Sequence, residues 1–176
     1  MSAPGRSGRG RPRLRTTTWL ALTGVVACSG GLDGIGSPAR AANRISERVL
    51  AHMMADDASG PAAAGAEAVC VALGPIRQRV DPDPLFLGRF KEAEPPVHAW
   101  SECALDVGRG DRLVHVLTGD PAIGYTIEWP PTVTARRVFI DVAYYIAALD
   151  AAGYVCEVVL DDHDWRVESC KRTWIA

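Results

Sequence analysis

The sequence lacks the short motifs by which many enzymes are identified. It contains no GxSxG, SxxK or HExxH motif and no glycine-rich loop of the phosphate-binding kind. It also has no CxxC pair, so a redox or zinc site built on closely spaced cysteines is not indicated. No apolar run approaches the roughly 20 residues that a membrane-spanning helix needs. We therefore expect no catalytic residues of a recognised type, no cofactor and no membrane-spanning helix.

Acidic residues are absent from the first 27 positions, which contain five arginines. The whole chain has 19 basic and 21 acidic residues, so 14 basic residues oppose 21 acidic ones from Cys28 onward, a formal charge of −7. A surface of this sign repels phosphate backbones, and nucleic acid is not an expected partner. The composition, 48% hydrophobic and 23% charged over 176 residues, is typical of one globular domain.

The start of the chain has the layout of an export signal. Its arginine-rich opening is followed by a short apolar stretch, Trp-Leu-Ala-Leu-Thr-Gly-Val-Val-Ala, at residues 19–27. This order is typical of secretory signals, because the arginines stay at the negative cytoplasmic membrane surface while the apolar run enters the translocation machinery. We predict an export signal over residues 1–27 and an extracytoplasmic location for the rest.

The apolar stretch ends in Val-Val-Ala-Cys at residues 25–28, which resembles the lipobox of bacterial lipoproteins. The resemblance implies that Cys28 is acylated, becomes the mature N-terminus and anchors the protein to a membrane of the cell envelope. The alternative is cleavage after Ala41, at the Ala-Arg-Ala sequence of residues 39–41, which would make the protein periplasmic or secreted. Residues 28–42, rich in Gly, Ser, Ala and Pro, are predicted to form a flexible tether, and residues 43–176 a single domain.

Four cysteines remain when Cys28 is assigned to a lipid. An even number of cysteines in an oxidising compartment indicates two disulfides. Three pairings are possible, and loop length favours neighbours in sequence, Cys70 with Cys103 and Cys156 with Cys170.

The second pair conflicts with the predicted hairpin of residues 154–160 and 165–174. The register with the best apolar face sets Leu160 opposite Trp165 and Val158 opposite Val167. That register places Cys156 and Cys170 on opposite faces, so a disulfide there requires a bulge or a slipped register.

Periodicity predicts helices first and strands afterwards. Asn43 is expected to cap a helix that ends near Asp57, with its apolar face at Ile45, Val49, Leu50 and Met53. A short helix is predicted from Asp83, with Leu85, Phe86, Leu87 and Phe90 as apolar anchors. Strands are expected at residues 68–73, 113–117, 123–129 and 133–146, before the final hairpin.

This order predicts an α+β domain in which one or two N-terminal helices pack on a curved antiparallel sheet of four to six strands. The arrangement resembles the broad cystatin-like or NTF2-like class. The ending, from Gly153-Tyr154 to Trp174-Ile175, resembles that of small uncharacterised exported bacterial proteins. Neither resemblance implies an activity.

Three groups of polar residues are candidate sites. One turn contains three carboxylates and an imidazole, at Asp161, Asp162, His163 and Asp164. These residues are either a candidate metal site or the solvated tip of the hairpin. Asp141 lies among aromatic residues on the second face of the longest strand, either lining a pocket or facing solvent beside Arg137. The third group is His98, Trp100, Ser101 and Glu102. It contains residue types that occur in hydrolase sites, but it does not match a hydrolase motif.

The leading hypothesis is an exported, lipid-anchored binding or accessory module of the cell envelope, with the membrane and an envelope protein as partners. One alternative is a small enzyme or small-molecule binder with a pocket around Asp141, in which His115 also takes part. The other is a structural envelope component. A ligand-sized cavity at Asp141 would favour a binder or enzyme, and a filled sheet face would favour a protein partner.

Overall fold

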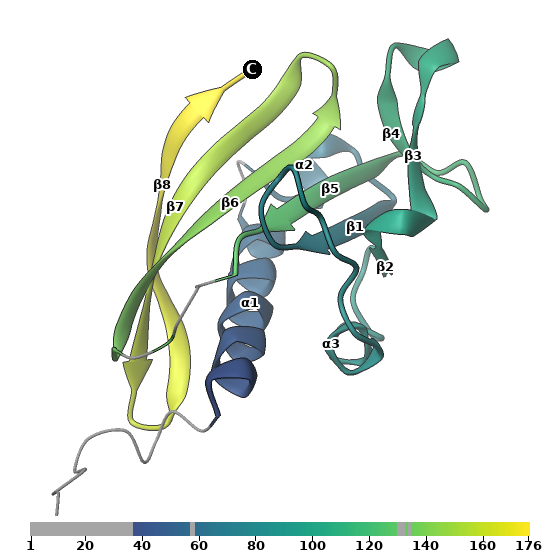
Figure 1. The fold of residues 1–176 in the computed structure, drawn as a ribbon. Helices are drawn as coiled ribbons and strands as arrows, with labels where there is room; N and C mark the ends of the chain where they lie inside the picture. Colours follow the sequence, from purple (N-terminus) through teal and green to yellow (C-terminus); the bar gives the residue numbers. More distant parts are fainter. Residues whose placement is uncertain (1–36, 57–58, 130–132, 134) are drawn as a thin grey trace, which may run out of the picture.

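The computed structural model describes residues 37–56, 59–129, 133 and 135–176 (Figure 1). The predicted export signal and Cys28 lie outside these residues. The order of elements begins with three helices, α1 (Pro38–Ala55), α2 (Pro61–Ala64) and α3 (Pro84–Gly88), interrupted by the strand β1 (Ala68–Leu73). No helix in the described part of the chain is long and apolar enough to cross a membrane.

Seven strands and two 3₁₀ turns follow. They are β2 (Val97–Ala99), η1 (Trp100–Glu102), β3 (Cys103–Asp106), η2 (Val107–Arg109), β4 (Arg112–His115), β5 (Ala122–Ile127), β6 (Arg137–Ala147), β7 (Asp150–Asp161) and β8 (Asp164–Ile175). Six strands form one sheet in the order β2-β1-β5-β6-β7-β8, and β3 and β4 form a separate hairpin. The predicted α+β class is confirmed.

The sheet is mixed, whereas the sequence predicted an antiparallel one. β1 runs parallel to both β2 and β5, and the pairs β5–β6, β6–β7 and β7–β8 are antiparallel. β1 is buried at all six positions because it is covered on both sides. Its continuous apolar run is therefore typical of a strand in a parallel pairing.

The helix α1 packs against one face of the sheet (Figure 1). The predicted apolar face is confirmed, since Ile45, Val49, Leu50 and Met53 are all fully buried. The helix begins earlier than predicted, at Pro38, and the Ser37 hydroxyl accepts a hydrogen bond from the Arg40 backbone N–H as its N-cap. The predicted tether is therefore wrong at residues 38–42, which are helical.

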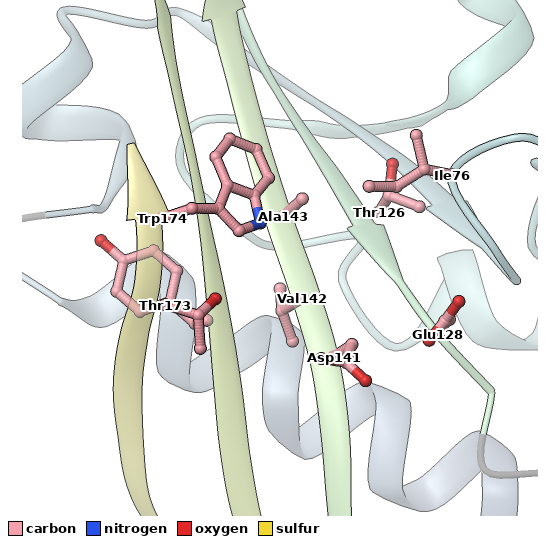
Figure 2. Close-up of a pocket in the computed structure, with 9 residues that line it drawn as sticks. Ile76, Thr126, Glu128, Asp141, Val142, Ala143, Thr173 and Trp174 are labelled. Carbon is pink, nitrogen blue, oxygen red and sulfur yellow. The ribbon is translucent and has the colours of Figure 1, made fainter. Parts of the chain in front are cut away.

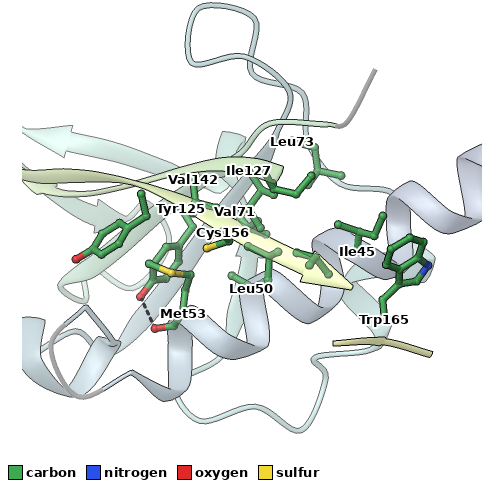
Figure 3. Packing of buried hydrophobic residues seen from close by; sticks show 14 of the residues in the cluster. Ile45, Leu50, Met53, Val71, Leu73, Tyr125, Ile127, Val142, Cys156 and Trp165 are labelled. Carbon is green, nitrogen blue, oxygen red and sulfur yellow. Dashed lines mark hydrogen bonds between the residues drawn. The ribbon is translucent and has the colours of Figure 1, made fainter. Parts of the chain in front are cut away.

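The core lies between α1 and the inner face of the sheet (Figure 3). Tyr125 on β5 is its largest fully buried side chain, and its hydroxyl donates to the Ser59 carbonyl oxygen at 2.7 Å. Trp165 is buried as predicted, with 4% of its surface exposed. The short helix α3 is capped by Asp83 as predicted, but Leu85 is exposed, so it is not one of its anchors.

Both predicted disulfides are present, Cys70–Cys103 and Cys156–Cys170. The hairpin has the predicted pairs Leu160–Trp165 and Val158–Val167, and it also pairs Cys156 with Cys170. The apolar pairs and the cysteine pair can coexist because the register shifts by one residue: Val158 pairs with Val167, whereas the adjacent Glu157 pairs with Ser169. This bulge turns the two cysteines to the same face. Two disulfides indicate an oxidising, extracytoplasmic environment.

Candidate functional site

The face of the sheet opposite α1 carries the candidate site. On β6, Ile140, Val142 and Ile146 point into the core, so the alternate residues point outward. Phe139 and Asp141 on this outer face are exposed. The interpretation of Asp141 as an outward-facing strand acid is therefore correct, but its expected partner Arg137 is bound instead to Glu157, at 2.6 Å.

A groove of about 210 Å³ lies on this face and contains Asp141 (Figure 2). It spans strands from β5 to β8 and is closed on one side by the loop that follows β1. Its lining residues are Ile76, Thr126, Glu128, Asp141, Val142, Ala143, Tyr154, Thr173 and Trp174. Asp141 is thus an exposed residue that also lines a groove.

Trp174 forms one wall of the groove. It lies at the end of the edge strand β8, directly against Gly153 of β7, which has no side chain to displace the ring. Gly153 in turn pairs with Ala143 on β6, and Figure 2 shows the indole beside Ala143. The small residues under the ring allow it to lie close to the sheet, while 43% of its surface stays exposed to a ligand.

Two carboxylates occupy the end of the groove, Asp141 on β6 and Glu128 directly after β5. The Glu128 backbone N–H donates to the Asp141 carbonyl oxygen at 2.8 Å, which brings the two residues side by side (Figure 2). Within the described part of the chain, neither carboxylate forms a salt bridge. Two acidic groups without a basic partner produce a negative potential at this end of the groove.

Arg79 lies beyond Thr126 and does not line the groove. Its Nε donates to the Thr126 hydroxyl at 3.2 Å, and its guanidinium stacks over the Trp100 ring at 4.1 Å. Burial lowers the pKa of Arg79 below its ordinary value. Arg79 belongs to a second hollow of about 320 Å³, beside the β3–β4 hairpin, which is lined by Trp100 and Tyr145 among others. The Arg79 side chain therefore lines the second hollow and contacts the acidic groove only through its hydrogen bond to Thr126.

The predicted metal ligands in the turn between β7 and β8 contact arginines. Asp164 accepts hydrogen bonds from Arg44 and Arg48 of α1, and Asp161 lies 3.7 Å from Arg166. Asp162 has a positive φ of 49° and forms the tight turn with His163. Asp164 thus connects the hairpin to the helix, whereas Asp161 is paired with Arg166 within the hairpin.

His98, Glu102 and His115 come together at the other end of the sheet. His98 and Glu102 belonged to the predicted hydrolase-like cluster, and His115 was the expected partner of Asp141. The structure instead brings the rings of His98 and His115 within 4.0 Å, centroid to centroid. His115 does not line the groove that contains Asp141. Sequence spacing did not reveal this grouping, because His115 comes from a different strand.

The chain matches no protein-family model, no curated protein sequence and no solved structure. Its fold and its disulfides define it as an extracytoplasmic α+β domain with a small acidic groove on the open face of a mixed sheet.

Proposed function

We propose that this protein is an exported, lipid-anchored binding module of the cell envelope, and that its groove holds one cationic group presented by an envelope protein. The observation that carries the proposal is the pair Asp141 and Glu128, which form no salt bridge with any described residue and lie in a groove walled by the exposed ring of Trp174. A cation in this groove would gain Coulomb attraction and, over the indole face, a cation–π contribution of about 0.5–2 kcal/mol.

The volume of the groove limits the size of the ligand. Typical small-molecule sites enclose roughly 300–1,000 Å³, whereas this groove holds about 210 Å³. A space of that size fits one side chain or one small amine. A lysine or arginine side chain of a partner protein meets both the size and the charge requirement, and this favours the binding-module hypothesis over an enzyme that encloses a substrate.

The beginning of α1 supports the proposal that the mature chain starts at Cys28. Cleavage after Ala41 would remove the Ser37 cap and the first turn of α1, including Ala41 itself, which is 1% exposed. Maturation at Cys28 keeps this turn and leaves residues 29–36 between the lipid-bearing Cys28 and the helix cap. Fractionation followed by intact-mass measurement tests this point. An acylated Cys28 in the membrane fraction is expected, and an unmodified chain that begins at Ala42 would contradict it.

The groove is tested by calorimetric titration with three blocked amino acids. N-acetyl-lysine methylamide and N-acetyl-arginine methylamide are expected to bind, while the uncharged N-acetyl-norleucine methylamide is not. The double variant Asp141→Asn/Glu128→Gln should lose at least tenfold in affinity, because it removes both charges and keeps the side-chain shapes.

The double variant Asp162→Asn/Glu92→Gln is the matched control. It removes the same net charge at two exposed positions outside the groove. If both double variants weaken binding equally, the effect comes from net charge alone and the groove is not the site. Equal affinity for the lysine and norleucine probes would likewise contradict recognition of a cation.

A further inference from the structure

We propose that His98, Glu102 and His115 form a site for a divalent transition-metal ion, with Zn²⁺ as the ion that best suits these donors. The site is separate from the acidic groove and does not depend on the proposed binding function. Two imidazoles and one carboxylate are a donor set that Zn²⁺ accepts in proteins.

The ligand atoms already converge. Nδ1 of His98 lies 3.0 Å from a carboxylate oxygen of Glu102, and Nε2 of His115 lies 3.9 Å from the same oxygen. One ligand atom from each residue falls within 4.8 Å of the other two. A tetrahedral zinc ion with bonds of about 2.0–2.2 Å holds its ligand atoms about 3.3–3.6 Å apart. The two rings are stacked at an interplanar angle of 27°, so binding one ion requires side-chain rotations that turn both rings toward a common centre.

The burial and hydrogen bonding of the His115 side chain are a second, independent indication of a bound ligand. Its side chain is 6% exposed, and its Nε2 is buried without a hydrogen-bond partner among the residues that the structure describes. Its other nitrogen, Nδ1, lies 3.0 Å from the Thr118 hydroxyl. With Nδ1 donating to Thr118, Nε2 presents a lone pair toward Glu102, as in histidine ligands that are oriented by a hydrogen bond on the far nitrogen. A buried lone pair without a partner is costly, and a bound cation would satisfy it.

The disulfide Cys70–Cys103 holds the strands that carry these ligands. In the β1–β2 pair His98 lies opposite Cys70, and in the β3–β4 pair His115 lies opposite Cys103. Glu102 directly precedes Cys103. The disulfide therefore joins the neighbours of all three ligands and limits how far the two strand pairs can separate.

Three protein ligands leave one position of a tetrahedral ion open. Glu102 is the most exposed of the three, at 47% of its side chain, so the open position faces solvent on its side. A water molecule or a donor atom from a partner would complete the coordination there, as in zinc sites that keep an exchangeable position.

Calorimetric titration of the full chain with ZnCl₂, after treatment with chelator, tests the proposal. One zinc ion per chain is expected to bind. His98→Asn and Glu102→Gln should each lower the affinity at least tenfold, since each removes one ligand. Both residues are partly exposed, so these variants are expected to fold, and a native far-ultraviolet dichroism spectrum checks this.

His163→Asn is the matched control, because His163 lies in the β7–β8 turn among carboxylates and is also exposed. It should bind zinc as the unmodified chain does. Absence of a binding heat in the unmodified chain would overturn the proposal. Loss of binding in His163→Asn with retention in His98→Asn would overturn it as well and would place the ion at the turn.

Discussion

The indole ring of Trp174 occupies the space that a side chain on Gly153 would need. The two residues are paired across β7 and β8, and the ring covers the glycine on the outer face of the sheet. A glycine in the interior of a strand often marks a close approach of this kind. Here the close approach creates the wall of the acidic groove, so the shape of the groove depends on the absence of a side chain at position 153.

Gly153→Ala should therefore lift Trp174 from the sheet. A Cβ at this position would overlap the ring, and the overlap should cost about 1–2 kcal/mol of unfolding free energy, as for other small-to-large changes. Urea denaturation measures the loss. In a Trp174→Ala background the same substitution should cost less than about 0.5 kcal/mol, because the clash is gone. An equal cost in both backgrounds would show that the two residues do not interact in this way.

Tyr125→Phe should lower the unfolding free energy by about 1–2 kcal/mol at neutral pH, because it leaves the buried Ser59 carbonyl without its donor. Burial, with a smaller effect from Asp56, raises the pKa of Tyr125 far above its ordinary value of 10. The unfolded chain loses this proton near pH 10 while the folded chain keeps it, so stability falls as the pH rises above about 10.

The variant should consequently show a shallower loss of stability between about pH 10 and 11 than the unmodified chain. Burial also raises the pKa values of Tyr144 and Tyr145, so part of the alkaline slope should remain. Urea denaturation at about pH 8, 10 and 11 measures both slopes. Identical slopes would mean that Tyr125 does not contribute.

Asp164→Asn should weaken the contact between the β7–β8 turn and α1. Partial burial alone would raise the pKa of Asp164, but hydrogen bonds from Arg48 and the Trp165 backbone, with the charges of Arg48 and Arg44, lower it. A carboxyl whose pKa is lower in the folded state adds stability above its unfolded pKa and loses it as the pH falls through its folded pKa. The side chain is 46% exposed, so the loss at pH 7 should be about 0.5–1 kcal/mol.

The difference between this variant and the unmodified chain should shrink as the pH falls below about 4. It should also shrink in high salt, which screens exposed ion pairs. Denaturation at several pH values and salt concentrations gives the comparison, with Asp162→Asn in the same turn as the control. A stability difference that is the same at every pH would argue against a role for the ion pair.

Removal of the two disulfides should have different effects on metal binding. Cys156→Ala/Cys170→Ala and Cys70→Ala/Cys103→Ala should each cost roughly 3–4 kcal/mol, because each disulfide closes a loop in the unfolded chain. Only the second pair should also lower the affinity for Zn²⁺, since it alone lies beside the three proposed ligands. Calorimetry below the unfolding temperature of each variant measures this. Equal zinc affinities in the two variants would show that the Cys70–Cys103 disulfide does not organise the site.

Patterns along one segment were predicted well from sequence. The spacing of Ile45, Val49, Leu50 and Met53 identified the buried face of α1, because side chains at helical spacing lie on one side. The apolar pairs Val158–Val167 and Leu160–Trp165 gave the correct hairpin register, and the cysteine pairing indicated that a bulge was needed. Both inferences rest on residues that are neighbours in sequence or joined by one short turn.

Contacts between distant segments were decided by the tertiary structure. Strand periodicity contains no information on direction, so the parallel pairing of β1 with β2 and β5 could not be obtained from it. The grouping of His98 and Glu102 with His115 depends on where the β3–β4 hairpin is placed against β1. The groove likewise depends on long-range pairing, which places Trp174, Asp141 and Glu128 around one hollow.

The sequence by itself thus determined the α+β class, the disulfide partners and the faces of the longest elements, since these follow from local periodicity and loop length. The fold alone decided which polar side chains share a site. Ligand and groove residues come from strands that are separated in sequence, and only the packing of the sheet sets the distances between them.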